Sequence, residues 1–366
     1  MDIRAAILWE QGKPLSVEAA TLDGPGPGEV LVEMHAAGVC HSDLHPARGD
    51  WPMKVPVVLG HEGAGIVRDV GAGVSRVKKG DHVVLCWAPA CGECPSCREG
   101  RAVLCDRVEK VTFRNKLPSG TTRLHARGMD VAPFLGTACF ADAVVVPEAG
   151  AIPVADDIPF ESLATLGCAV LTGVGAVTSC ARVPPRASVA VIGVGGVGLN
   201  VVQGAVMSSC AQIVAVDTRP APLKIAETFG ATHTIDGSGD AVAAIRALTG
   251  GRGADFVFDT VGSPATLTSA IAATKKGGTV VLTGLSRADA QAAFPMFPFV
   301  MQEKFLMGSV YGSGKPWEDI PRLARWFQEG KLKLTELVAR TYALDGINEA
   351  LNALASSDGA RGVIKW

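Results

Sequence analysis

The chain has 366 residues, of which 48% are hydrophobic and 19% charged, so it is too apolar to be disordered and long enough for two compact domains. Its formal net charge of -2, with no clustered Lys/Arg stripe, does not favour binding to nucleic acid or anionic lipid, and small molecules are the expected partners. The N-terminal stretch MDIRAAILWEQGKP reaches charge and proline too early for a signal peptide, and the apolar stretches are shorter than the roughly 18–20 residues that span a bilayer. We therefore expect a cytoplasmic protein without a membrane segment.

The chain begins with a β-rich region and continues with alternating strands and helices. Residues 1–151 read as short strands, such as EVLVEMHAAGV, separated by Gly/Pro turns. From about Phe160 strand-like and helix-like runs alternate, which predicts a parallel sheet with helices on both faces. The predicted strands are SVAVIG, QIVAVD, ADFVFDTVG and TVVLTGL, and the predicted helices are VGLNVVQGAVMSS, PLKIAETFGA and ATLTSAIAATKKG. After Gly312 the pattern predicts the helices IPRLARWFQEG and INEALNALASS and a closing strand, GVIKW.

Four cysteines with the spacing C-x2-C-x2-C-x7-C, Cys91, Cys94, Cys97 and Cys105, form the densest cluster in the sequence. In a reducing compartment clustered cysteines are more often ligands than disulfides. Four thiolates at about 2.3 Å from a tetrahedral zinc complete a closed structural site. An iron–sulfur cluster and a group of merely buried thiols are the alternatives. The scattered Cys86, Cys139, Cys180 and Cys210 are interpreted as core or incidental.

A second set of metal-ligand types is spread along the chain. A catalytic zinc needs three protein ligands and an open fourth position, and Cys40, His61 and Cys168 would form such a set. An ion held in this way acidifies an alcohol and so prepares it to lose hydride. Asp43 is placed to accept the free N–H of His61, and Glu62 is a candidate outer carboxylate or transient ligand. Each residue alone is a weak signal, because a single His or Cys is more often a core residue; their joint presence with a nucleotide motif changes that balance.

The nucleotide motif is GVGGVG, which follows the predicted strand SVAVI and opens a helix, as the dinucleotide fold requires. Gly193 allows a tight turn, Gly195 lets the backbone approach a pyrophosphate, and Gly198 allows close packing. Asp217 ends the next strand, where a carboxylate binds a ribose diol and repels a 2′-phosphate. We predict NAD rather than NADP, although Arg219 lies close enough to soften the preference. A turn that binds nothing is the alternative. The cofactor-binding residues of the motif are Gly193, Gly195, Gly196, Val197 and Gly198.

Taken together, these residues resemble the zinc-containing alcohol dehydrogenases of the medium-chain dehydrogenase/reductase superfamily along the whole chain. The matching motifs are GHEGAG, the four-cysteine lobe, GVGGVG and the terminal ARGVIKW, in the family's order. The resemblance implies an α/β protein in which a GroES-like catalytic domain, 1–169 with the lobe 91–105, is followed by a Rossmann NAD-binding domain, 170–311. The chain then returns to the catalytic domain over 312–366. It also implies two zinc ions per subunit, one catalytic and one structural.

The resemblance further assigns roles to single residues. Ser42 resembles the hydroxyl that accepts the substrate proton and passes it through the nicotinamide ribose to His45 at the surface, which is sensible chemistry for a group that titrates near neutral pH. Thr172 resembles a residue that packs on the nicotinamide. His41 and Arg361 occupy positions of cationic contacts to the pyrophosphate. A lysine that often reaches the adenosine ribose is replaced here by Pro222, with Lys224 displaced.

The positions that match the family's substrate channel are apolar, which favours a dry slot that suits a primary alcohol, either short or flat and aromatic. The long segment 107–135 and this pocket resemble the aryl (benzyl) alcohol dehydrogenases. The oxidation of such an alcohol to the aldehyde by NAD, and the reverse reaction, is the expected activity. Taken alone, any one of these channel positions is more often an ordinary residue of the hydrophobic core. They are Trp51, Trp87, Leu104, Phe134, Leu135, Leu285 and Val310.

Two other functions compete. A glutathione-dependent formaldehyde dehydrogenase has an arginine beyond the last lobe cysteine, where this chain has Glu109, and a carboxylate there would repel the glutathione carboxylate. A protein that binds NAD and zinc without catalysis is a remote alternative, because such relatives lack the metal ligands that are intact here. The segment from Phe297 to Tyr311 resembles the family's dimer-forming strand and is apolar, so a homodimer is expected, with a tetramer as the alternative.

Overall fold

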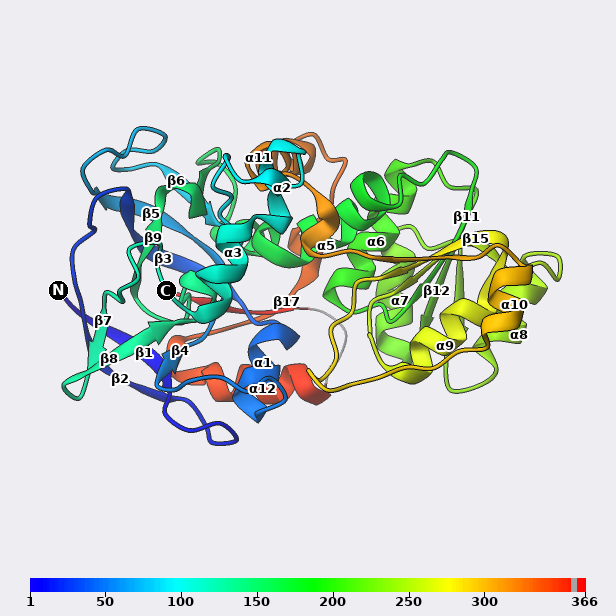
Figure 1. Cartoon of the computed structure of the whole chain (residues 1–366), viewed down its shortest axis with the longest axis horizontal. Helices are drawn as coiled ribbons and strands as arrows, with labels where there is room; N and C mark the ends of the chain where they lie inside the picture. Colours follow the sequence, from blue (N-terminus) through cyan, green and yellow to red (C-terminus); the bar gives the residue numbers. More distant parts are fainter. Residues whose placement is uncertain (357–360) are drawn as a thin grey trace. The chain divides into compact units, whose positions relative to one another are not determined.

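The computed structural model describes residues 1–356 and 361–366, which divide into two compact units (Figure 1). The first unit contains residues 1–168, 315–356 and 361–366, and the second contains residues 169–314. Ser357 of the predicted helix INEALNALASS and Ala360 of the terminal motif lie outside the described residues.

A small closed barrel forms one part of the first unit. Its strands pair in the order β1-β2-β7-β8-β4. In β1, DIRAAIL, five of the seven side chains are buried, and because successive strand residues point to opposite faces, both faces of the end of this strand are covered. Because a closed barrel has no free edge, its short strands need no further covering. The strands are β1 Asp2–Leu8, β2 Ser16–Leu22, β7 Leu124–Ala126, β8 Met129–Pro133 and β4 Val57–Val58.

The remainder of the first unit is built on a seven-stranded sheet whose order is β10-β6-β5-β3-β18-β17, with β9 also pairing with β3. The last strand of the chain, β18, lies between β3 and β17, so the predicted closing strand GVIKW is confirmed and the C-terminus is part of the N-terminal fold. The strands are β3 Glu29–Gly38, β5 Glu62–Val70, β6 His82–Leu85, β9 Ala143–Pro147, β10 Ala151–Pro153, β17 Val338–Tyr342 and β18 Arg361–Lys365.

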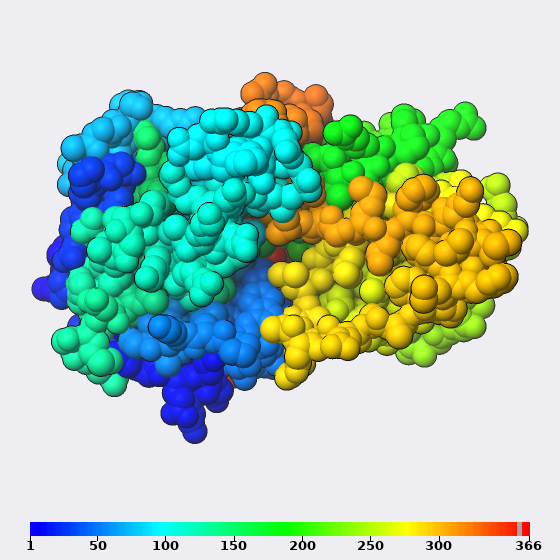
Figure 2. Space-filling view, in the orientation of Figure 1, coloured from blue at the N-terminus to red at the C-terminus, as the bar shows by residue number. Residues whose placement is uncertain are grey.

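The helices of the first unit include one that carries candidate site residues and two that the sequence predicts. The helix α1, His41–Arg48, follows β3 directly and ends at Gly49, whose φ of 86° lies in the left-handed region that glycine adopts without strain. The predicted C-terminal helices are present as α11, Pro316–Gln328, and α12, Ile347–Ser356. The four-cysteine segment forms a surface lobe with the short helices α2, Pro95–Arg98, and α3, Asp106–Lys110; it is cyan in Figure 2.

The second unit is a six-stranded sheet in the order β13-β12-β11-β14-β15-β16, in which every neighbouring pair is parallel. Strands covered on both faces read as continuous apolar runs, as VAVI does in β11. The doubly wound α/β sheet predicted from the sequence is confirmed. The strands are β11 Ser188–Ile192, β12 Gln212–Asp217, β13 His233–Asp236, β14 Ala254–Asp259, β15 Thr274–Leu282 and β16 Phe305–Gly308. The helices are α6 Gly196–Met207, α7 Pro220–Thr228, α8 Ala241–Leu248, α9 Pro264–Ala273 and α10 Met296–Met301.

Two expectations for the secondary structure need correction. The strand β13 and the helix α8 have no counterpart among the elements predicted from the sequence, because the strand HTID is short and polar. The segment 297–311, expected to be one strand, begins instead as the end of α10, and only Phe305–Gly308 is a strand. The glycine-free run MFPFVM has no alternation of polar and apolar residues that would hold a strand to one face.

One long apolar helical run, Phe160–Cys180, joins the two units. It passes the length and hydropathy criteria for a bilayer span, with a mean hydropathy of 1.7. However, 83% of its most apolar window is buried inside the protein, as in the core helix of a folded domain. The sequence does not predict this helical run, because its glycines interrupt the apolar stretch.

We predict that Gly65→Ala destabilises the first unit, because a Cβ at this position on β5 would overlap with the backbone carbonyl oxygen of Glu33 on β3. Overpacking of this kind lowers the free energy of unfolding by about 1–3 kcal/mol. Gly24→Ala is the matched control, since nothing lies within 4 Å of a Cβ there. Urea unfolding of both variants measures the difference, and equal stabilities would contradict the packing argument.

Candidate functional site

The four lobe cysteines converge on one point. Their sulfur atoms all lie within 4.8 Å of one another, and the Sγ atoms of Cys91 and Cys97 are 4.0 Å apart. Sulfurs at about 2.3 Å from a tetrahedral zinc would be separated by about 3.8 Å, so the spacing fits that ion. The backbone N–H of Cys91 donates to Cys105 Sγ, and that of Cys94 donates to Cys91 Sγ. Hydrogen bonds from the backbone of Glu93 and Cys94 contribute to lowering the pKa of Cys91 to about 6, which favours the thiolate that a metal needs.

A second cluster lies inside the first unit and contains Cys40, His61, Glu62 and Cys168, all buried, with ligand atoms within 4.8 Å of one another. Cys40 stands between β3 and α1, and His61 immediately precedes β5, which pairs with β3. Cys168 lies on a π-helical turn, Leu166–Val170, of the long apolar run. Such a bulge re-aims side chains within a helix, and π-bulges are frequent at functional sites. The three sequence-predicted ligands are therefore brought together.

The chemistry of this cluster suits a divalent cation. The hydrogen bond with the Cys168 thiol, together with the nearby Arg361 and His61, lowers the pKa of Cys40 well below its ordinary value despite burial. Two thiolates and one imidazole form the donor set of a catalytic zinc that keeps one position open. Phe134 stands edge-on to His61, with ring centroids 6.0 Å apart, and contributes an apolar wall beside the imidazole.

Asp43 fixes the orientation of His61. Its Oδ1 lies 2.9 Å from His61 Nδ1 and accepts from the Gly60 N–H, while Oδ2 accepts from the Cys40 N–H. Burial acts to lower the pKa of His61, but the Asp43 carboxylate and Cys40 outweigh it and raise that pKa well above its usual value. In the neutral imidazole, a proton on Nδ1 is directed to this carboxylate, and Nε2 is the atom left to bind a metal.

Glu62 forms an ion pair with Arg361, a residue that the family resemblance placed at the pyrophosphate. Arg361 Nη2 lies 2.8 Å from Glu62 Oε1, and Arg361 Nη1 donates to the Val39 carbonyl. Burial raises the pKa of Glu62 to about 8, while Arg361 acts in the opposite direction. Gly38, opposite Glu62 on β3, leaves room for this carboxylate, because a Cβ there would overlap with it. The guanidinium expected at a pyrophosphate is thus buried, 4% exposed, beside the metal-ligand cluster.

The predicted proton-transfer residues lie on α1. Ser42 and His45 are both half-buried and three residues apart, so they share one face of the helix, while His41 is exposed at its first position. His45 Nδ1 lies 3.0 Å from Asp50 Oδ2, and its ring stacks on Trp51 with centroids 4.8 Å apart. No sequence motif predicts the contact between Asp50 and His45, because it depends on the conformation of the turn after α1.

The glycine motif forms the expected strand–turn–helix in the second unit. Gly193 has a φ of 84°, and Gly195 precedes the first residue of α6. A Cβ at Gly195 would point into open space, whereas one at Gly198 would overlap with the Gly193 carbonyl oxygen. Helix N-termini with free amides are anion sites, so this turn is suited to a pyrophosphate. Gly196 and Val197 form the first turn of α6, and Thr172 is buried on the short helix α5, Leu171–Gly175.

Asp217, at the end of β12, already has protein partners. Its Oδ2 accepts from the Val194 N–H at 3.1 Å, and its Oδ1 accepts from the backbone and side chain of Arg219. Asp217 as a whole is 8% exposed. It therefore supports the glycine turn in addition to any contact with a ribose.

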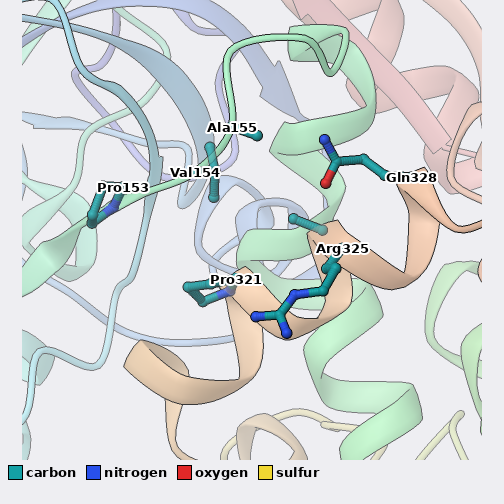
Figure 3. Close-up of a pocket in the computed structure, with 7 residues that line it drawn as sticks. Pro153, Val154, Ala155, Pro321, Arg325 and Gln328 are labelled. Atoms are coloured by element: carbon teal, nitrogen blue, oxygen red, sulfur yellow. The ribbon is translucent and has the colours of Figure 1, made fainter.

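The predicted substrate-pocket residues are distributed over both units. In the first unit Trp87 and Phe134 are buried, Trp51 and Leu135 are half-buried, and Leu104 is exposed. In the second unit Leu285 is exposed and Val310 is half-buried. A separate open depression of about 300 Å³ in the first unit contains none of these residues (Figure 3). It is lined by Pro153, Val154, Ala155, Pro321, Ala324, Arg325 and Gln328.

Comparison with known proteins identifies the family. Residues 26–156 match the alcohol dehydrogenase GroES-like domain, and residues 196–329 match the zinc-binding dehydrogenase family. An NDMA-dependent alcohol dehydrogenase of Amycolatopsis methanolica is 39% identical over 100% of this chain and 99% of its own. Alcohol dehydrogenase B of Mycobacterium tuberculosis is 38% identical with the same coverage. The chain belongs to the zinc-dependent alcohol dehydrogenases.

A solved structure agrees with this assignment. The crystal structure of benzyl alcohol dehydrogenase from Acinetobacter calcoaceticus superposes with a TM-score of 0.94 and 33% identity, over 100% of this chain and 99% of that one. The S-(hydroxymethyl)glutathione dehydrogenase of Paracoccus denitrificans is also related, at 34% identity over both full lengths, which is lower than the identities of the Amycolatopsis and Mycobacterium alcohol dehydrogenases. The protein is an oxidoreductase that acts on alcohols, and the non-catalytic alternative is not supported.

We predict that Asp43→Asn weakens zinc binding at the Cys40 cluster, because the amide lacks the charge that holds the proton on His61 Nδ1. The loss of such a partner typically costs about 10- to 100-fold in metal affinity. Competition with a chelator measures this affinity, and the zinc affinity of the four-cysteine lobe serves as an internal reference. Asp50→Asn, which changes a carboxylate bound to a histidine outside the cluster, is the matched control. Equal zinc affinity in both variants would contradict the role of Asp43.

Proposed function

We propose that the protein oxidises primary alcohols, aromatic or of short to medium chain, to aldehydes with NAD, and catalyses the reverse reaction, in the cytoplasm. The observation that carries the proposal is the buried set of two cysteine sulfurs and one oriented imidazole, Cys40, Cys168 and His61. A zinc ion held by these residues would supply Lewis acidity to an alcohol oxygen, and NAD would accept the hydride. The four lobe cysteines would hold a second, structural zinc.

The side chains around the cluster support the proton transfer. Ser42 would accept the alcohol proton, and His45 would exchange it with solvent, because its Nδ1 is held by Asp50 and its Nε2 is then the atom available for a proton. Asp43 keeps the His61 ring in one tautomer, and the Phe134 ring excludes water from one side of it.

The nucleotide would bind at the glycine turn of the second unit. The amides at the start of α6 are oriented to receive a pyrophosphate, with Gly193, Gly195, Gly196, Val197 and Gly198 forming its binding surface. Thr172 and His41 are further candidate contacts. Asp217 favours NAD, because a carboxylate repels a 2′-phosphate. Arg361 is a weaker candidate for the pyrophosphate than the sequence suggested, since its guanidinium is engaged with Glu62.

We infer an aromatic preference from two features. The chain is closely similar in structure to a benzyl alcohol dehydrogenase, and the candidate pocket positions of the first unit are dominated by aromatic rings, namely Trp51, Trp87 and Phe134. The alternative, S-hydroxymethylglutathione, is disfavoured by Glu109 on α3, a carboxylate at the position of the family's glutathione-binding arginine.

The decisive experiment is a comparison of initial rates of NADH formation by zinc-replete enzyme on benzyl alcohol, ethanol, a longer primary alkanol and S-hydroxymethylglutathione. We expect benzyl alcohol to have the highest kcat/KM, and NAD to be preferred over NADP. Because one relative is named for NDMA, each alcohol is also assayed with that compound added. A lead for the glutathione adduct would show that the interpretation of Glu109 is wrong.

We also propose a homodimer that forms through the free edge of the six-stranded sheet. Among the described residues, the strand β16 pairs with β15 alone, and its side chain Phe305 is 59% exposed. The adjacent helix α10 exposes Met296 and Phe297 by more than three quarters, and this segment, gold in Figure 2, lies on the surface of the second unit. An apolar sheet edge of this kind is normally covered by a partner.

Light scattering at micromolar concentration should give a mass of twice 37.8 kDa for the wild type. Phe305→Lys should shift the protein toward the monomer, because a charge on the edge strand opposes pairing. Phe113→Lys is the control, since it changes a phenylalanine that is 53% exposed in the first unit. A monomeric wild type would refute the proposal.

A further inference from the structure

One peptide of the glycine turn is held at both of its polar ends. The carbonyl oxygen of Gly193 accepts a hydrogen bond from Thr260 Oγ1 at 2.6 Å, and the N–H of the same peptide, on Val194, donates to Asp217 Oδ2 at 3.1 Å. Thr260 follows β14 and Asp217 ends β12, and these strands flank β11 on opposite sides. The turn after β11 is thus fixed from both neighbouring strands.

This peptide is one that needs to be held. Gly193 has a φ of 84°, and glycine populates positive and negative φ almost equally, so the peptide after it can rotate with little steric resistance. A rotation would exchange the directions of its C=O and N–H. It would also move the Gly193 carbonyl, against which α6 packs at Gly198 without room for a Cβ. The amides that follow at the start of α6 would then lose their common direction.

Thr260 is itself held rigidly. Its backbone N–H donates to the Ile192 carbonyl at 3.0 Å. The preceding residue, Asp259, is fully buried and accepts hydrogen bonds from the Val261 and Gly262 amides and from Thr266 Oγ1. The threonine hydroxyl therefore has a fixed position from which it can orient the Gly193 carbonyl.

We propose that Thr260 is a positioning residue for the dinucleotide: its hydroxyl fixes the Gly193–Val194 peptide and thereby the affinity of the glycine turn for the cofactor. This inference rests on the proposed nucleotide site but adds a residue that the motif does not contain. The hydroxyl itself does not touch the dinucleotide. It acts by limiting the turn to the conformation in which its amides converge.

The test compares three threonine variants of the full-length protein. Thr260→Val keeps the shape and removes the hydroxyl, and it should weaken NADH binding by roughly 3- to 10-fold, the value of one neutral hydrogen bond. Thr260→Ser should restore wild-type affinity. Thr274→Val is the matched control, because the buried hydroxyl of Thr274 also donates to a carbonyl, that of Ala270 at 2.7 Å. Thr274 is the first residue of β15, so it lies at the end of the parallel strands opposite to the glycine turn. This control variant should leave NADH affinity unchanged.

Two readouts separate this inference from the proposed function. NADH fluorescence titration gives the affinity, and hydrogen exchange of the unliganded protein reports on the Val194 amide, which should exchange faster in Thr260→Val alone. Unchanged exchange and unchanged affinity in Thr260→Val, or equal losses in Thr274→Val, would overturn the role of Thr260. If the Val194 amide exchanges faster in Thr260→Val but the wild type binds no NADH, Thr260 does fix the Gly193–Val194 peptide and the proposed dinucleotide site is refuted.

Discussion

The geometry of the metal-ligand cluster depends on the buried carboxylate of Asp43. This group is fully buried, and its two oxygens accept from the Cys40 N–H, the Gly60 N–H and His61 Nδ1. The donors belong to the segments that follow β3 and precede β5, so one side chain joins the two places from which two candidate ligands project. Without it three buried donors would lose their acceptor, and each unsatisfied donor costs about 1–3 kcal/mol. The same carboxylate therefore fixes the backbone at Cys40 and Gly60 and the orientation of the His61 ring.

A residue from the far end of the chain contributes a positive charge to this cluster. Two cysteines, Asp43 and Glu62 place potential negative charge in a buried volume, which is costly unless cations are present. Arg361, on the last strand, contributes one cation through its ion pair with Glu62. Because β18 lies between β3 and β17, the pairing of the C-terminal strand is what brings the guanidinium to this position. Folding of the first unit thus requires the chain to return after the second unit.

The sequence was informative where chemistry needs scarce residue types at fixed spacings. The lobe cysteines, the Cys40–His61–Cys168 set and the glycine turn could be predicted because cysteine, histidine and consecutive glycines have few structural uses in such patterns. The pairing of Arg361 with Glu62, and of His45 with Asp50, could not, because each depends on how distant segments or a following turn meet in space. The conformation of 297–311 was also mispredicted, since an apolar run without periodicity does not distinguish strand from helix. Thr260 carries no motif at all.

The two oxygens of Asp217 place a limit on how cofactor choice can change in this fold. Oδ2 supports the glycine turn through Val194, while Oδ1 accepts from Arg219, so the residue that we propose excludes a 2′-phosphate also stabilises the turn proposed to bind the pyrophosphate. Replacing Asp217 to admit NADP would remove one end of the support on the Gly193–Val194 peptide and leave only Thr260 at the other. Selectivity and affinity are therefore coupled through a single side chain. Retaining Asp217 and changing the residues around Arg219 is the route that leaves the turn intact.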